Sequence, residues 1–147
     1  MNISSPSLQA PPELTPGLKA DLARITGPGR LLTDPADCWP YGYDNSRRHA
    51  LPQAVVFASD TEQVAALVRL CVAAGLPLTA RGRGTGTTGA TVPDRGGVVL
   101  SFERMGRILR IARADRLAVV EPGVINEGLQ QAVGAQGFFW PPDPTSA

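Results

Sequence analysis

Short apolar runs alternate along the chain with segments whose apolar residues recur at helical spacing. The run 54–58 is rich in β-branched residues and is typical of a buried strand. A capping box formed by Ser59 and Glu62 then predicts a helix that ends at Gly75. We expect the buried face of this helix to carry Val64, Leu67, Val68 and Cys71. Because another apolar stretch, 77–80, follows, the order predicts a right-handed, parallel β-α-β crossover.

An amphipathic segment precedes this crossover. Leu18, Leu22 and Ile25 recur at helical spacing, and the Gly-Pro-Gly run 27–29 ends the helix that they predict. Residues 1–16 contain prolines and serines but little apolar content, so we expect a flexible N-terminal tail there. The folded domain is therefore predicted to span residues 17–147.

Three further elements are predicted after the crossover. The run 98–101 is expected to add a third strand. The apolar runs 108–111 and 117–120 are separated by a polar stretch and predict an antiparallel hairpin. Asn126 is expected to cap a last helix that Gly137 closes. The inward residues of that helix are predicted to be Leu129, Ala132 and Val133.

Composition excludes several classes of partner. The 147 residues are 43% hydrophobic, which is enough for a core, and the formal net charge is only +1. The basic residues are spread along the chain, so we expect neither nucleic acid nor an anionic membrane surface as a partner. The N-terminus lacks the pattern of a secretory signal, and no stretch approaches the length of a membrane span. We therefore expect a cytoplasmic protein without direct membrane insertion.

The cysteines and the histidine do not indicate a metal site. Cys38 and Cys71 are too few and too far apart for a zinc set, and a disulfide framework is not expected. His49 is the only histidine and has no partner ligands near it in the sequence. No metal is therefore predicted.

The strongest chemical signal is the run 77–89, PLTARGRGTGTTG, in which an apolar stretch opens into a glycine-rich loop. Glycines at 82, 84, 86 and 89 permit positive φ angles and a close approach of the backbone to a ligand. Successive N–H groups in such a turn can converge on an anion. Each hydrogen bond to a charged oxygen contributes about 1.5–3 kcal/mol. The loop is therefore predicted to bind a diphosphate.

Other phosphate-binding folds fit this loop less well. A Rossmann site needs a helix that starts within the glycines, yet residues 90–97 leave no room for one before the strand 98–100. A P-loop needs a lysine, whereas Gly89 is followed by Ala90 and Thr91. RNA binding through Arg-Gly repeats is disfavoured because the sequence has no repeats and no interleaved aromatic residues.

Several linked motifs resemble one known family. The segments that carry the resemblance are 77–89, 97–109 (GVVLSFERMGRIL), 120–123 (VEPG) and 138–146 (FFWPPDPTS). Their order and spacing resemble the FAD-binding PCMH-type, or vanillyl-alcohol-oxidase-like, flavoproteins, in the branch of glycolate oxidase, D-lactate dehydrogenase and D-2-hydroxyacid dehydrogenase. The resemblance implies an α+β fold. It further implies that residues 17–147 form the N-terminal part of the FAD-binding domain: its first, parallel β-α-β lobe and the start of its second lobe.

The resemblance also implies the cofactor and its contacts. It implies FAD, held without a covalent bond, because Thr85 stands where covalently flavinylated relatives often carry a histidine. Arg83 is about equally well explained as a solvated side chain, and Arg81 as one that packs the strand end. The prolines are also compatible with rigid turns alone. The implied cofactor-binding residues are Arg81, Gly82, Arg83, Gly84, Thr85, Gly86, Thr87, Thr88, Gly89, Pro122, Gly123, Pro142, Asp143 and Ser146.

The family reaction is the oxidation of a 2-hydroxy acid, of the glycolate or D-lactate type, to a 2-oxo acid. The family's substrate-binding and catalytic residues match no position here, so no catalytic residue is assigned and the chain's own enzymatic activity is left open. We expect a truncated, inactive portion whose partners are FAD and the remaining part of the flavoenzyme or other oxidase subunits. The alternative is a non-catalytic nucleotide-binding or subunit-interaction module.

Overall fold

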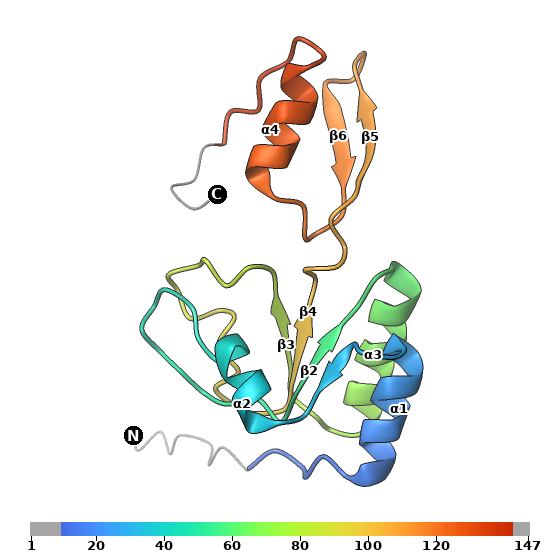
Figure 1. Cartoon of the computed structure of the whole chain (residues 1–147), viewed down its shortest axis with the longest axis vertical. Coiled ribbons are helices and arrows are strands. Elements are labelled where there is room, and N and C mark those ends of the chain that lie inside the picture. Colours follow the sequence, from blue (N-terminus) through green and yellow to red (C-terminus); the bar gives the residue numbers. More distant parts are fainter. Residues whose placement is uncertain (1–9, 143–147) are drawn as a thin grey trace, which may run out of the picture.

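A computed structural model describes residues 10–142, and the predictions for residues 1–9 and 143–147 lie outside them (Figure 1). Its main sheet has four strands in the order β1-β2-β4-β3. The strands are β1 (Leu31–Leu32), β2 (Ala54–Phe57), β3 (Leu78–Arg81) and β4 (Val98–Ser101). β2 and β3 each pair in parallel with β4, whereas β1 is antiparallel to β2. The predicted parallel β-α-β unit and third strand are confirmed.

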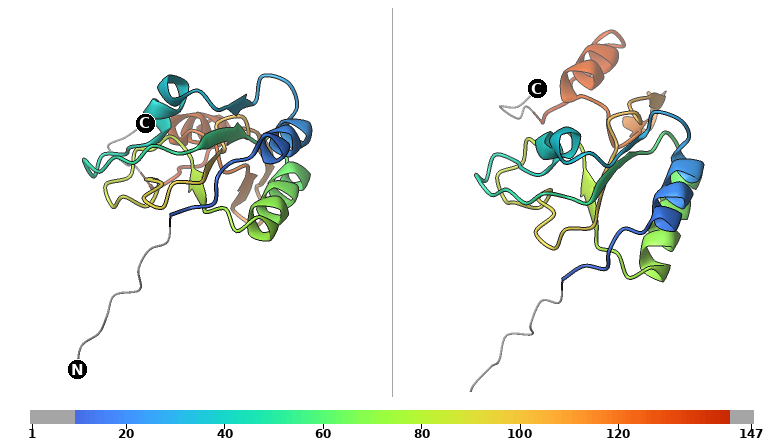
Figure 2. Two further views of the ribbon diagram at one scale, coloured as in Figure 1. Left: turned by 90° about the horizontal axis from the view of Figure 1, so that it is seen from below. Right: turned by 60° about the horizontal axis from the view of Figure 1, so that its bottom comes forward.

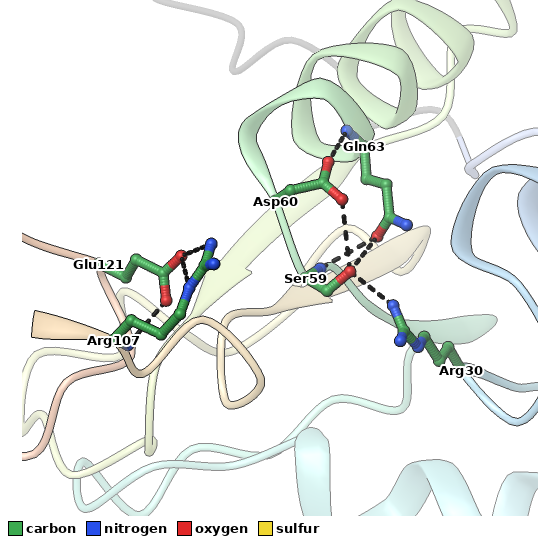
Figure 3. A network of polar contacts seen from close by, with 6 residues as sticks. All are labelled: Arg30, Ser59, Asp60, Gln63, Arg107 and Glu121. Carbon is green, nitrogen blue, oxygen red and sulfur yellow. Dashed lines mark hydrogen bonds and ion pairs between the residues drawn. The ribbon is translucent and has the colours of Figure 1, made fainter. Parts of the chain in front are cut away.

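The helix of the crossover, α3 (Thr61–Ala73), begins one residue later than the predicted capping box requires. The prediction of Ser59 and Glu62 as the box is wrong. Asp60 is the N-cap and its carboxylate accepts from the Gln63 N–H, while the Gln63 side chain accepts from the Ser59 N–H (Figure 3). At the other end Gly75 adopts a φ of 65° and closes the helix as predicted.

Alternate strand residues face two separate clusters. On one face of the sheet, Val56, Val98 and Leu100 pack against Leu22 and Leu67, which come from α1 (Pro16–Thr26) and α3. On the other face, Val55, Phe57 and Val99 pack with residues of α2 (Pro35–Cys38) and the 3-10 helix η1 (Trp39–Tyr41). Figure 2 shows α1 and α3 side by side against one face of the sheet.

One prediction about this layer is corrected. Val68 is 40% exposed, so it does not belong to the buried face of α3, where Leu70 packs against the core instead. In the described part of the predicted tail, residues 10–16, Leu14 is buried, and Gln53 Nε2 donates to the Pro12 carbonyl at 3.0 Å.

Residues 102–142 form a smaller layer beyond the carboxyl ends of β3 and β4 (Figure 1). It contains the predicted hairpin, β5 (Ile108–Ala112) and β6 (Leu117–Val120), and the helix α4 (Asn126–Gly134). Leu129 and Val133 are buried as predicted. Gly137, with a φ of 79°, closes the helix.

Asn126 is not the N-cap of α4, contrary to the prediction. The cap residue is Ile125, which has no side chain able to accept a hydrogen bond. The Asn126 carboxamide instead accepts from Trp140 Nε1 at 2.7 Å and donates to the Pro142 carbonyl at 3.2 Å. It thereby ties the segment after α4 to the start of that helix.

A short junction, formed by residues 102–107 and 121–123, lies at the base of the smaller layer, and its Met105 packs into the core of the sheet. Glu121 is only 6% exposed, and its carboxylate accepts from the Arg107 guanidinium and from the Arg107 backbone N–H (Figure 3). The Gly123 N–H donates to the Met105 carbonyl at 2.8 Å. No helix within residues 10–142 combines the length and the apolar character needed to cross a membrane.

Candidate functional site

The glycine-rich loop begins where β3 ends, at the carboxyl edge of the parallel strands. Gly84 has a φ of 69° and Gly89 a φ of 80°, both in the region that favours glycine. Gly82 and Gly86 do not adopt positive φ angles, so the prediction holds for only two of the four glycines. A β-carbon at Gly86 or Gly82 would meet no other atom within 4 Å. Those two positions are therefore open to a ligand rather than strained.

Arg81 lies beneath the loop rather than in front of it. It is 6% exposed, and its guanidinium donates to the carbonyls of Tyr43 at 2.7 Å and Pro40 at 3.3 Å. A β-carbon on Gly84 would overlap with this guanidinium. The interpretation of Arg81 as a residue that packs the strand end therefore fits the structure, and its guanidinium organises the neighbouring segment.

The backbone amides of residues 82–88 have no hydrogen-bond partner in the part of the chain that the structure describes. Among residues 10–142, no hydrogen bond is donated by an N–H group from Gly82 to Thr88. The hydroxyl-bearing residues Thr85, Thr87 and Thr88 are exposed as well. Unpaired backbone donors are the groups that an anionic ligand can satisfy. Together with the positive φ angles at Gly84 and Gly89, these unpaired donors form a site that fits a diphosphate.

The segment 43–48 braces the loop from one side. The Asn45 backbone N–H donates to the Gly86 carbonyl at 2.9 Å, and Asn45 Nδ2 donates to the Thr85 carbonyl at 3.1 Å. The buried Asp44 carboxylate accepts from the Ser46 N–H at 2.9 Å and from Thr91 Oγ1 at 3.4 Å. The hydrogen bonds from Ser46 lower the pKa of Asp44, so this carboxylate stays charged at neutral pH.

Positive charge is available at both ends of the loop. A β-carbon on Gly89 would lie 3.0 Å from Nη1 of Arg48, which forms an exposed ion pair with Asp94 at 3.4 Å. Arg83 is exposed and lines a cavity of about 300 Å³. The other residues that line this cavity all belong to the smaller layer, among them Glu103, Gly106, Gly123 and Gly128.

The structure places two of the predicted site residues, Arg83 and Gly123, in the lining of one cavity. Gly123 shares the cavity with Arg83, and Pro122 precedes it as an exposed residue. Pro142 is exposed and its carbonyl is taken by Asn126. Asp143 and Ser146 lie outside the described residues.

Sequence reasoning missed Asn45 and Arg48. Both lie about 40 residues before the glycines that they contact, and neither belongs to a motif with a known spacing. A Tyr-x-x-Asp pattern, from Tyr41 to Asp44, lies directly before Asn45. This pattern does not indicate which side chains reach the loop.

Comparisons with known proteins identify this arrangement. The FAD binding domain family matches residues 52–147. The chain belongs to this family. The FAD-binding domain predicted from the linked motifs is therefore confirmed, as is FAD as the family's cofactor.

The relatives of this FAD-binding domain are much longer proteins. Glycolate oxidase subunit GlcD of Bacillus subtilis is 34% identical over 134 residues, which are 90% of this chain and 28% of that protein. D-2-hydroxyglutarate dehydrogenase of Stutzerimonas stutzeri is 39% identical over 133 residues, 90% of this chain and 29% of that protein. The chain thus spans less than a third of these relatives, and the predicted branch of the family is confirmed.

A solved oxidase structure has the same fold. The 4-ethylphenol oxidase from Gulosibacter chungangensis, solved as an isoeugenol complex, superposes with a TM-score of 0.73 at 29% sequence identity. The match covers 88% of this chain and 27% of the oxidase. The α+β architecture predicted from the resemblance is therefore confirmed.

Proposed function

We propose that residues 82–89 bind the diphosphate of FAD, within an oxidoreductase that converts a 2-hydroxy acid of the glycolate or D-lactate type into a 2-oxo acid. The observation that carries the proposal is the row of amides from Gly82 to Thr88, which have no acceptor among residues 10–142. The relatives of this chain, a glycolate oxidase subunit and a D-2-hydroxyglutarate dehydrogenase, favour a 2-hydroxy acid substrate.

The residues of this chain bind and orient the cofactor. The loop amides and the hydroxyls of Thr85, Thr87 and Thr88 donate to the phosphate oxygens, and Arg83 adds positive charge from the cavity that it shares with Gly123. Pro122 supports that turn, and the segment containing Pro142, Asp143 and Ser146 contacts the flavin and its ribityl chain. When bound, the flavin accepts the hydride removed from the substrate.

Glycine substitutions in the loop, made in the complete flavoenzyme, test this proposal. Gly86→Val adds a side chain where the protein itself leaves space, so the fold is retained and FAD loading is lost. Gly84→Val also abolishes loading, but it additionally disturbs Arg81. Arg83→Ala is the control and weakens binding by less than tenfold, since one exposed charge contributes little. The flavin-to-protein absorbance ratio measures loading, and circular dichroism reports the fold. Normal loading of Gly86→Val with loss in Arg83→Ala would replace the amide mechanism by an arginine clamp.

FAD is held without a covalent bond in this proposal. Thr85 cannot attack the flavin methyl group, and Cys38 is only 1% exposed, with a thiol pKa raised by burial. Acid precipitation should therefore release all of the flavin into the supernatant. Flavin absorbance that stays with the washed pellet would show a covalent link and point to His49.

We propose that oxidation of the 2-hydroxy acid needs further parts of the enzyme besides these 147 residues. We expect the 147 residues alone to bind FAD weakly and to reduce no dye with glycolate or D-lactate. The reason is that the rest of the flavoenzyme, or other oxidase subunits, would supply the missing contacts. These partners are proposed to lie in the cytoplasm. Calorimetry and dye reduction test this directly. A submicromolar dissociation constant together with turnover would overturn it.

A non-catalytic interaction module is the second candidate. It is favoured by the apolar side chains that the hairpin exposes: Leu109 is 56% and Leu117 49% exposed. Dye reduction by the chain together with its completing partner separates the two candidates, because only the oxidoreductase portion gains activity.

A further inference from the structure

Asn45 makes two hydrogen bonds to consecutive carbonyls of the glycine loop. Its backbone N–H donates to the carbonyl of Gly86, and its side-chain Nδ2 donates to the carbonyl of Thr85. Asn45 itself is exposed and forms no part of a core cluster. The two hydrogen bonds of Asn45 therefore hold the conformation of the loop, and Asn45 does not serve as a core residue.

Because the peptide unit is planar, these two hydrogen bonds also determine the direction in which two backbone N–H groups point. In a trans peptide unit the C=O of one residue is antiparallel to the N–H of the next. The described residues contain no cis peptide bond. With the carbonyls of Thr85 and Gly86 turned toward Asn45, the N–H groups of Gly86 and Thr87 point away from it. Those are two of the donors that have no partner among residues 10–142.

Two buried side chains fix the position of Asn45. Arg81 donates to the Tyr43 carbonyl at 2.7 Å and to the Pro40 carbonyl at 3.3 Å. Asp44, next to Asn45, accepts from the Ser46 N–H at 2.9 Å and from Thr91 on the far side of the loop. The backbone on both sides of Asn45 is thus held before any ligand arrives.

We propose that Asn45 is a positioning residue for the diphosphate site, which sets the Gly86 and Thr87 amides toward the phosphates. This inference rests on the proposed function of the loop. Asn45 touches the loop carbonyls, and its effect on the ligand passes through the two amides. A preformed donor pair of this kind strengthens binding because the loop does not have to be ordered by the ligand.

The test compares substitutions of Asn45 in the 147-residue chain. Asn45→Asp replaces the donor by an acceptor beside the Thr85 carbonyl, and Asn45→Ala removes the side-chain donor but keeps the backbone bond to Gly86. Gln53→Glu is the matched control, because Gln53 also donates a side-chain amide to a backbone carbonyl, that of Pro12, at 3.0 Å. FAD and ADP are titrated while amide proton and nitrogen shifts are recorded for the labelled protein.

We expect Asn45→Asp to weaken FAD and ADP about tenfold and Asn45→Ala about threefold, in the range of one hydrogen bond. In the native protein, both ligands should shift the Gly86 and Thr87 amides, and in Asn45→Asp this response should be lost while the amides of α3 keep their positions. Gln53→Glu should bind both ligands like the native protein. Asn45→Gln, which keeps a carboxamide, should recover part of the affinity.

The results distinguish the role of Asn45 from the function of the loop as the diphosphate site. If the native loop responds to FAD and Asn45→Asp binds within twofold of it, the role of Asn45 is overturned while the loop remains the diphosphate site. If neither ligand shifts the native Gly86 and Thr87 amides, the proposed function of the loop fails and the inference falls with it. If Asn45→Asp does not fold, Asn45→Ala and Asn45→Gln decide on the same criterion.

Discussion

The sheet region, residues 10–101, and the hairpin region, residues 102–142, bury similar apolar strands to very different extents. All residues of β2 and β4 are buried, because helices or helical turns cover both faces of the sheet. In the hairpin, by contrast, Leu109, Leu117 and Val119 are 56%, 49% and 37% exposed. Burial of apolar area is the main source of folding free energy. The comparison therefore indicates that the sheet region is stable on its own core, whereas the hairpin region depends on its junction.

The two tryptophans allow this difference to be measured, since Trp39 lies in the sheet region and Trp140 in the hairpin region. Leu67→Ala, at a side chain with no exposed surface, should lower the free energy of unfolding by about 4 kcal/mol in denaturant titrations. Leu129→Ala should cost about 2 kcal/mol, because Leu129 lies in a thinner layer.

Single-tryptophan versions of each variant give the control. Leu67→Ala should move the transitions of both tryptophans, since the hairpin region loses its support with the sheet. Leu129→Ala should move the Trp140 transition more than that of Trp39. Equal shifts of both tryptophans in Leu129→Ala would show one cooperative core and contradict the comparison.

The junction itself is tested at Gly123. A β-carbon there would overlap with the Phe102 carbonyl oxygen and lie 2.9 Å from that of Met105, and both are backbone atoms that cannot rotate away. Gly123→Ala should therefore cost about 3 kcal/mol, at the upper end for single substitutions. Gly128→Ala, where a β-carbon meets nothing within 4 Å, is the matched control and should be nearly neutral or slightly stabilising. If Gly123→Ala unfolds at the same denaturant concentration as Gly128→Ala, the junction is not the rigid link inferred here.

The order of elements could be predicted because it follows from periodicity and from helix-ending glycines. Gly75 and Gly137 both adopt the positive φ that closes a helix. The starts of helices were less predictable, since Ser59 and Asp60 are both good caps and only the backbone angle selects Asp60. Asn126 was a reasonable cap by residue type, yet its carboxamide is engaged by Trp140 and Pro142, contacts that no local pattern contains.

The site was predictable in its location and less so in its detail. The glycines marked where the backbone could approach a ligand, but the sequence could not show that Gly86 is open while Gly84 covers a guanidinium. The partners of the loop, Asn45 and Arg48, come from a segment about 40 residues earlier. Such pairings depend on how two loops pack, which spacing along the chain does not encode.

The pH dependence of stability sharpens the role of the junction. Hydrogen bonds from Arg107 lower the pKa of the Glu121 carboxyl below its usual value. A lowered folded-state pKa gives stability that is present above about pH 4.5 and is lost as the pH falls through the folded-state pKa. At pH 7, Glu121→Gln should therefore be less stable than the native protein, and the two should converge on acidification. Glu13→Gln, at an exposed carboxylate, is the control. A constant gap between native protein and Glu121→Gln from pH 7 to pH 3 would exclude this contribution.

The smallest effect is expected at the helix caps, where the two regions again differ. The Asp60 carboxylate accepts from the Gln63 N–H at 2.8 Å, whereas α4 begins at Ile125 without a side-chain cap. Asp60→Ala should cost about 1 kcal/mol, the usual value of an N-cap. Asp60→Asn keeps an acceptor at the same place and should restore most of the loss. The Trp39 transition should report the change, because α3 packs on the sheet. A cost in Asp60→Asn as large as that in Asp60→Ala would mean that the negative charge at the helix N-terminus, rather than the hydrogen bond, stabilises α3.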